Sequence, residues 1–192
     1  TLPVLSLVLL PLSYLVGRLP SALVVAGRHG RDPLAEGSGN PGATNVARVA
    51  GRRAGVVVLV ADVAKGLVCA LVGSVVGGDA LGMACGIAAV VGHVAPVTRK
   101  GGKGVATAAG VALALQPWAA LVAAVAFVAT QAVTHITALA SIAAAVVLTA
   151  AVVAAGAPTW EIVAFGALAG LVIGRHADNL RRLRAGTEHR SP

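Results

Sequence analysis

Residues 54–76 read AGVVVLVADVAKGLVCALVGSVV, a run that predicts a membrane-spanning helix. A helix needs about 20 predominantly apolar residues to cross the hydrocarbon core of a bilayer, and this run has that length and composition. Its two charged residues, Asp62 and Lys65, are three positions apart and therefore share a helix face. Charged groups inside a span usually pair or line a site. We expect an ion pair that supports a nearby site, with direct substrate contact as the alternative.

The composition of the whole chain indicates that a bilayer is the solvent for much of it. Of the 192 residues, 57% are hydrophobic and only 11% are charged, whereas a soluble domain has about 25% charged residues. The net charge of +8 could suggest nucleic acid, but aromatic residues make up only 3%. The basic residues flank apolar runs, as they do in loops that set membrane orientation. We expect a lipid environment and no nucleic-acid partner.

Seven apolar runs follow one another along the chain. They cover residues 2–26, 54–76, 80–97, 105–115, 118–133, 136–155 and 159–173. The fourth run is short, and Gln116 and Pro117 separate it from the fifth. Six spans result if the fourth and fifth runs form one kinked helix, and seven result if they form a tight hairpin. The two cysteines, Cys69 and Cys85, lie within these runs and predict neither a disulfide framework nor a metal site.

The distribution of positive charge favours seven spans. Lysines and arginines gather in segments 28–53, 99–103 and 175–190, and the remaining connections have none. Positively charged loops stay on the cytoplasmic side, and only seven spans place all three segments there. We therefore expect an all-α integral membrane protein with seven transmembrane helices, one of them short. Its N-terminus lies outside, its C-terminus is cytoplasmic, and residues 1–192 form a single domain.

Residues 36–48, EGSGNPGATNVAR, form the first of three polar segments. Its glycines let the backbone approach a ligand closely, and turns of this kind can form anion-binding nests. Ser38, Thr44 and Asn45 add hydroxyl and amide groups, and Arg48 adds a planar guanidinium suited to phosphate. The segment predicts an anion site, and a solvated turn at Asn40-Pro41-Gly42 is the alternative.

Residues 100–107, KGGKGVAT, form the second polar segment and lead into an apolar run. Glycines and lysines before a helix start favour phosphate, because helix N-termini present free N–H groups. The spacing is not that of a P-loop, so ATP hydrolysis is not predicted. A plain turn is the alternative. His93, in the preceding segment 92–96, fits a helix-end packing role as well as a catalytic one.

Residues 175–188, RHADNLRRLRAGTE, form the third polar segment. His176 and Asn179 are three positions apart and share a face if the last helix continues into the cytoplasm. Histidine can act as a general base near neutral pH. The alternative is a positively charged helix end on the inner side of the membrane, which accounts for the arginines but not for the pairing of His176 with Asn179.

Taken together and in this order, these segments resemble the bacterial acyl-phosphate:glycerol-3-phosphate acyltransferase family, called PlsY. The resemblance covers essentially the whole chain. Its motifs are Ser13-Tyr14-Leu15 with Gly17 and Pro20, residues 37–48, Asp62-x-x-Lys65-Gly66, Gly92-His93 with Pro96, residues 100–107, Leu139-Ala140-Ser141-Ile142, and His176-x-x-Asn179-x-x-Arg182-Leu183 with Gly186-Thr187-Glu188. Each motif alone is weak, and all of them at family-like intervals are a specific signal.

The resemblance implies a reaction at a bacterial cytoplasmic (inner) membrane, with the active site facing the cytoplasm. A fatty acyl group passes from acyl phosphate to the 1-hydroxyl of glycerol 3-phosphate, which gives lysophosphatidic acid and phosphate as the first step of phospholipid synthesis. No cofactor or metal is implied. Acyl-CoA is not the implied donor, and none of the five histidines has Asp five positions later, as acyl-CoA-dependent acyltransferases do.

The resemblance also implies roles for individual residues. Those implied in catalysis are Ser38, Arg48, Lys103, His176 and Asn179. Those implied in substrate or phosphate binding are Gly39, Asn40, Thr44, Asn45, Gly101, Gly102, Lys103, Gly104 and Ser141. Asp62, Lys65, His93 and Glu188 are implied to be structural residues near the site. A covalent acyl-Ser38 intermediate is the chemical alternative to direct transfer.

Some positions depart from the family pattern. Arg18 and Ala138 stand where the family more often has Ser, and Thr98-Arg99 replaces an apolar residue followed by Phe. The rival function is a membrane anion transporter or channel, since broken helices and intramembrane charge can also build a translocation site. That function predicts charges near mid-bilayer in several spans and an inverted repeat. Only Asp62 and Lys65 meet the first condition, and no repeat is evident.

Overall fold

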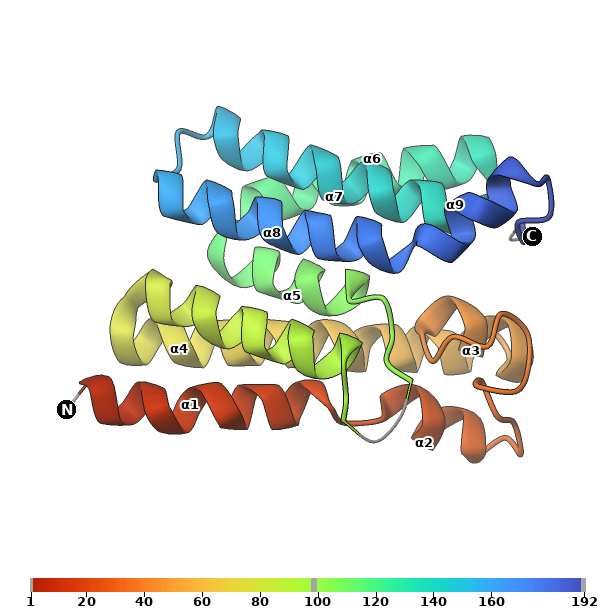
Figure 1. The fold of residues 1–192 in the computed structure, drawn as a ribbon, viewed down its shortest axis with the longest axis horizontal. Helices are drawn as coiled ribbons and strands as arrows, with labels where there is room; N and C mark the ends of the chain where they lie inside the picture. Colours follow the sequence, from red (N-terminus) through yellow and green to blue (C-terminus); the bar gives the residue numbers. More distant parts are fainter. Residues whose placement is uncertain (1, 98–99, 191–192) are drawn as a thin grey trace. The chain divides into compact units, whose positions relative to one another are not determined.

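The computed structural model describes residues 2–97 and 100–190, and the regular structure within these ranges is entirely α-helical (Figure 1). Thr98 and Arg99, where the sequence departs from the family pattern, lie outside the described residues. The chain divides into two compact units, Thr1–Leu115 and Gln116–Pro192. The first and second polar segments belong to the first unit, and the third belongs to the second unit.

The first unit consists of one long bent helix with shorter helices packed on it. Its elements are α1 (Leu2–Gly17), α2 (Ser21–Gly27), α3 (Ala43–Ala50), α4 (Arg52–Val94) and α5 (Val105–Leu115). Helix α4 changes direction at Gly77 and Gly78, whose backbone angles are not helical, and its two arms lie side by side (Figure 1). The arms are in backbone contact, since a Cβ atom at Gly73 would lie 2.7 Å from the carbonyl oxygen of Leu81.

Small residues also let α1 and α5 pack closely on α4. A Cβ atom at Gly92 would overlap the carbonyl oxygen of Tyr14 in α1, and one at Gly66 would overlap the carbonyl oxygen of Thr107 in α5. Membrane helices associate through close van der Waals packing of this kind, because lipid provides little hydrophobic driving force between them. The first unit is therefore held together by glycine-mediated backbone contact as well as by apolar side chains.

The second unit is a bundle of apolar helices with a short basic extension. Its elements are α6 (Pro117–Thr134), α7 (Thr137–Ala154), α8 (Thr159–Arg175) and α9 (Ala177–Arg184). Gln116 Nε2 donates to Glu161 Oε1 at 2.9 Å and so ties the start of α6 to the first turn of α8. Glu161 is only 5% exposed, so this hydrogen bond satisfies a buried polar group.

Several helices are long and apolar enough to cross a membrane. By length and composition these are Val4–Gly27, Arg52–Val94, Pro117–Thr134 and Thr137–Ala154, with the pair α8 and α9, bent by 50°, as a fifth. Arg52–Val94 contains the second predicted run and the third as far as Val94, three residues short of the predicted end at residue 97, and the short fourth run is α5, separate from α6. The all-helical fold agrees with the prediction, while the seven crossings and their orientation stay predictions.

Two helix ends differ from the sequence-based expectation. The first apolar run is interrupted between α1 and α2, where Pro20 has no N–H to donate to a helical hydrogen bond. The last run continues beyond the predicted end at residue 173 to Arg175 and then bends at His176 into α9. Each interruption lies beside residues of the predicted site, so the breaks in the helices shape the site.

Candidate active site

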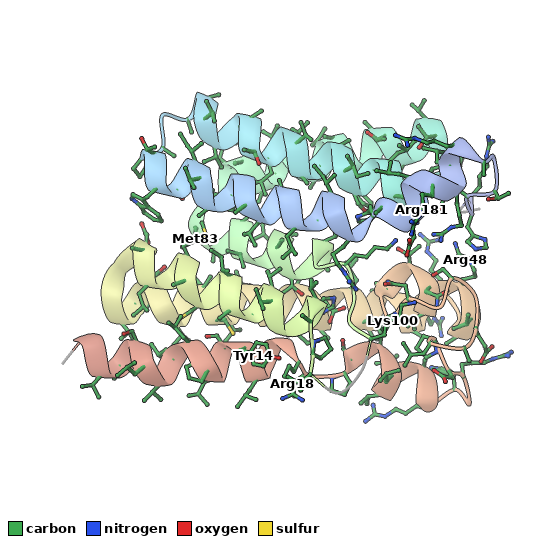
Figure 2. All side chains as sticks on the ribbon, viewed as in Figure 1. Tyr14, Arg18, Arg48, Met83, Lys100 and Arg181 are labelled. Atoms are coloured by element: carbon green, nitrogen blue, oxygen red, sulfur yellow. The ribbon has the colours of Figure 1, made fainter. Side chains whose placement is uncertain are left out.

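In the first unit, the functional segments gather at the end opposite the turn of α4. Helices α2 and α3 lie at that end (Figure 1), and so do Arg48 and Lys100, whereas Met83 lies nearer the turn (Figure 2). The first and second polar segments approach one another there. A Cβ atom at Gly39 would lie 3.8 Å from Lys100 Nζ. The fold therefore brings two predicted anion-binding segments together within one unit.

The first polar loop is organised by a buried amide. Asn45 lies in α3 and is 2% exposed. Its Oδ1 accepts a hydrogen bond from the backbone N–H of Ser38 at 2.8 Å, and its Nδ2 donates to the carbonyl oxygens of Pro33 at 2.9 Å and Glu36 at 3.0 Å. Both donor hydrogens of Nδ2 thus have partners within the protein. The side chain closes the loop over residues 33–38 onto α3.

Asn45 also brings Ser38 and Arg48 to the same place. Arg48, one turn further along α3, directs Nη1 to Asn45 Oδ1 at 3.5 Å and is otherwise exposed. Gly37 has φ +63°, and a Cβ atom there would overlap Asn45 Oδ1. A glycine is needed at this position both for the left-handed backbone and for the approach of the amide. Thr44, on the outer side of α3, is exposed, and Asn40 and Gly39 are partly buried.

The second polar segment packs against the end of α4. Gly101, Gly102 and Gly104 are buried, and Lys103 between them is partly buried. The N–H of Gly102 donates to the carbonyl oxygen of His93 at 3.1 Å. A Cβ atom at Gly102 would overlap His93 Nε2. Packing inside the protein therefore requires these glycines, independently of any ligand.

In the second unit, a histidine stands at the bend between α8 and α9. His176 is 2% exposed, and its Nδ1 lies 2.8 Å from the carbonyl oxygen of Val172. A carbonyl oxygen can only accept, so Nδ1 carries the proton and the lone pair of the neutral ring is on Nε2. The bend thus fixes both the position and the tautomer of the imidazole.

Glu188 fastens the C-terminal tail to α9. One carboxylate oxygen accepts from Asn179 Nδ2 at 2.7 Å, and the other pairs with Arg182 Nε at 2.9 Å. Asn179 is 6% exposed, and the Glu188 side chain is equally buried at 6%. Ser141 in α7 is also buried, and its hydroxyl donates to the carbonyl oxygen of Thr137 at 2.8 Å. The sequence motif placed Glu188 near Asn179 but did not reveal that it bridges two side chains.

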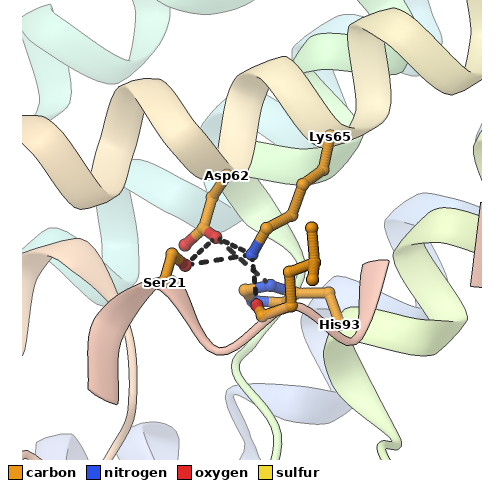
Figure 3. A network of polar contacts seen from close by, with 5 residues as sticks. Ser21, Asp62, Lys65 and His93 are labelled. Carbon is orange, nitrogen blue, oxygen red and sulfur yellow. Dashed lines mark hydrogen bonds and ion pairs between the residues drawn. The ribbon is translucent and has the colours of Figure 1, made fainter. Parts of the chain in front are cut away.

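A buried network that the sequence predicted only in part lies between α1, α2 and α4. Asp62 and Lys65 form an ion pair, and Ser21 and the backbone carbonyl of Leu19 join them (Figure 3). Ser21 was missed because nothing in the sequence near it signals a partner more than 40 residues away. The only local signal is the preceding Pro20, which predicts a helix start. Within the described residues no group of three or more His, Cys, Asp or Glu side chains is arranged to hold a metal.

Arg18, one of the departures from the family pattern, lies just after α1. Its guanidinium carbon is 5.8 Å from the centroid of the Tyr14 ring (Figure 2), within the range of a cation–π interaction. Tyr14 Oη in turn donates to the carbonyl oxygen of Ala95 at 3.1 Å. The second departure, Ala138, is buried in the first turn of α7.

Known proteins similar to this chain identify its family. The model of the family described as glycerol-3-phosphate acyltransferase matches residues 7–186. The chain belongs to the glycerol-3-phosphate acyltransferase family. A glycerol-3-phosphate acyltransferase of Pseudomonas aeruginosa is 44% identical over 181 residues, which are 92% of this chain and 95% of that protein. A family member from Geobacter metallireducens is 48% identical over 198 residues, with 96% of each chain covered.

Solved structures of the same family share the fold. The crystal structure of PlsY, an integral membrane glycerol 3-phosphate acyltransferase, in its glycerol 3-phosphate form has a TM-score of 0.94, with 37% identity, and covers 97% of this chain and 96% of that one. The lysophosphatidic acid form gives a TM-score of 0.91 at the same identity, with 97% and 95% covered. This member of the glycerol-3-phosphate acyltransferase family is therefore an all-helical, multi-pass integral membrane protein.

Proposed function

We propose that this chain transfers a fatty acyl group from acyl phosphate to the 1-hydroxyl of glycerol 3-phosphate. The observation that carries the proposal is the likeness, at 37% identity, to PlsY structures in forms that hold glycerol 3-phosphate and lysophosphatidic acid, an acceptor and its acylated product. The family model spans residues 7–186, across both units. We infer that residues 1–192 act as a single catalytic domain.

The reaction requires the two substrates to be positioned more than it requires either of them to be activated. The 1-hydroxyl oxygen attacks the carbonyl carbon of acyl phosphate, the bond from that carbon to the bridging oxygen breaks, and phosphate leaves with the electron pair. Because acyl phosphate is already activated, orientation and charge stabilisation can supply most of the acceleration. The hydroxyl proton passes to His176 Nε2 or to a phosphate oxygen of a substrate.

We assign the predicted residues to these tasks. Ser38 and Arg48, which the Asn45 amide holds at one place, stabilise the acyl phosphate as its carbonyl is attacked. Lys103 and the backbone N–H groups at the start of α5 hold phosphate, while the N–H of Gly102 stays bonded to the carbonyl oxygen of His93. His176 and Asn179 orient the attacking hydroxyl. Residues that complete phosphate binding are Gly39, Asn40, Thr44, Gly101, Gly102, Gly104 and Ser141.

The site faces the cytoplasm in the topology that we propose. Arg28, Arg31, Arg52 and Arg53 are exposed and lie near α2 and α3, at the same end of the first unit as Arg48. Positive residues at that end favour its retention on the inner side of a bacterial cytoplasmic membrane. With α4 crossing twice and α5 crossing as the short span, the chain has seven crossings, an external N-terminus and a cytoplasmic C-terminus.

The test is a reconstituted assay with matched controls. The purified protein, supplied with acyl phosphate and glycerol 3-phosphate, should release phosphate and form lysophosphatidic acid, and acyl-CoA should not replace the donor. Ser38→Ala and His176→Ala should abolish most of the rate. Ser74→Ala removes a hydroxyl in α4 that has no hydrogen-bond partner among the described residues, and His29→Ala removes an exposed imidazole. Both control variants should keep the wild-type rate of phosphate release. Equal rates in all four variants would contradict the catalytic roles of Ser38 and His176.

A further inference from the structure

Lys65 in α4 lies beside the break between α1 and α2, and all of its hydrogen-bond donors are used within the protein. The Lys65 side chain is 6% exposed, and its Nζ donates to Leu19 O at 2.7 Å, Ser21 Oγ at 2.9 Å and Asp62 Oδ1 at 2.6 Å (Figure 3). An ammonium group has only three donors. Lys65 is therefore an internal cation that holds α2 against α4, and it has no donor left for a substrate phosphate.

Asp62 connects this cation to a histidine on the other arm of α4. Its Oδ1 accepts the Ser21 hydroxyl at 2.6 Å and lies 3.7 Å from His93 Nδ1. The second distance is too long for a hydrogen bond, but it is within the range of an ion pair when the imidazole is protonated. Asp62 is 2% exposed and the His93 side chain 9% exposed, so water screens this attraction little.

His93 in turn supports the second polar segment through two contacts. Its carbonyl oxygen accepts the N–H of Gly102 at 3.1 Å, and its imidazole lies where a Cβ atom of Gly102 would be. A cleft beside this contact is lined by Ser21, His93, Lys100, Gly101 and Gly102. Movement of the imidazole would therefore shift the loop that carries Lys103.

We propose that Ser21, Asp62 and Lys65 are positioning residues for the acyl transfer, acting through His93 on the loop from Gly101 to Gly104. The proposal rests on the proposed function, which assigns substrate phosphate to that loop. The network fixes the position of the loop from Gly101 to Gly104, just before α5, and thereby the position of the phosphate that the loop binds. A network that served only to join α2 to α4 would support stability without affecting substrate binding.

Charge balance allows these two roles to be separated. In Lys65→Met the Asp62 carboxylate is buried without its cation, which is strongly destabilising, so both roles predict a lower melting temperature. The double variant Asp62→Leu/Lys65→Met removes both charges together and is often close to neutral in stability. It still removes the carboxylate that lies 3.7 Å from His93 Nδ1. If the network only joins α2 to α4, this double variant should bind its substrates normally. If the network positions the loop, substrate binding should be defective.

The experiment measures thermal unfolding together with KM and kcat for both substrates in the purified full chain. We expect Asp62→Leu/Lys65→Met to recover most of the melting temperature lost in Lys65→Met, while KM for a phosphate-bearing substrate stays raised roughly 10- to 100-fold, the range that small misplacements of binding groups produce. Ser21→Ala, which deletes only a hydroxyl, should raise the same KM several-fold. Glu161→Gln, at a buried hydrogen bond in the second unit, is the control and should leave KM unchanged.

The outcomes distinguish this proposal from the proposed function. An inactive wild-type protein would refute the function, and thermal stabilisation by inorganic phosphate would then test the loop directly, with Ser21→Ala expected to weaken it. If the wild type is active, wild-type KM values in a stable double variant overturn the positioning role. Should the double variant not fold, an unchanged KM in Ser21→Ala overturns it instead.

Discussion

Replacing Asn45 by Ala should disorganise the first polar loop without weakening the helix that carries it. The side chain makes hydrogen bonds with the N–H of Ser38 and with the carbonyl oxygens of Pro33 and Glu36. Alanine removes all three bonds, together with the longer contact from Arg48 Nη1 at 3.5 Å. Because alanine has the highest helix propensity, α3 itself should stay helical. The loss should therefore fall on the loop and on the position of Ser38.

The size of the effect follows from the three hydrogen bonds. Each contributes about 1 kcal/mol net, so the sum is about 3 kcal/mol. Ser38 is only partly buried, and water can replace part of this loss, which leaves about 2 kcal/mol. At 1.36 kcal/mol per factor of ten, the expected fall in kcat/KM is about 30-fold.

Two measurements separate loop ordering from direct contact between Asn45 and substrate. Steady-state phosphate release gives kcat/KM, and hydrogen exchange in the ligand-free protein reports whether residues 36–40 are ordered. We expect both to change in Asn45→Ala. Thr149→Ala is the control, since it removes one side-chain hydrogen bond within α7, to Ala145 O at 3.1 Å. A wild-type kcat/KM in Asn45→Ala would show that the amide does not position Ser38, and lost activity with unchanged exchange would make Asn45 a substrate ligand instead.

Three further outcomes are expected. Gly66→Ala should lower the melting temperature, because its Cβ would overlap the α5 backbone and overpacking costs about 1–3 kcal/mol. Gly166→Ala is the control and should not lower it, since no neighbouring element of the described chain lies within 4 Å of its Cβ. Glu188→Gln should loosen the tail and reduce activity several-fold in a rate assay, because the ion pair to Arg182 is lost while Asn179 keeps an acceptor. Raising ionic strength should increase KM for glycerol 3-phosphate in initial-rate measurements, since a basic site attracts anions less in salt.

The helices could be predicted from sequence because lipid imposes a simple rule. Every backbone polar group in the bilayer must be satisfied internally, so a long apolar run has to form a helix. The reversal of α4 at Gly77 and Gly78 falls between the predicted second and third runs. The break after α1 was not predicted, because apolar residues continue on both sides of Pro20 and the hydrogen bond from Lys65 to Leu19 O joins segments distant in sequence.

The site was predictable as three segments but not as a set of contacts. Glycines and charged residues marked where ligands can approach, and the structure places two of the segments together in the first unit. Local pattern could not show that Asn45 uses its amide to organise the loop, nor that the imidazole of His93 sits against Gly102. Both facts depend on packing between segments distant in sequence, which no motif encodes.

Attack of glycerol 3-phosphate at the carbonyl carbon of acyl phosphate, with cleavage of the bond to the bridging oxygen, can be followed with an isotope. Acyl phosphate labelled with ¹⁸O at the bridging oxygen is incubated with the purified protein and glycerol 3-phosphate, and both products are analysed by mass spectrometry. The label should appear in inorganic phosphate, lysophosphatidic acid should be unlabelled, and the two should form in equal amounts. Label in the lipid, or phosphate release that does not depend on glycerol 3-phosphate, would contradict that attack.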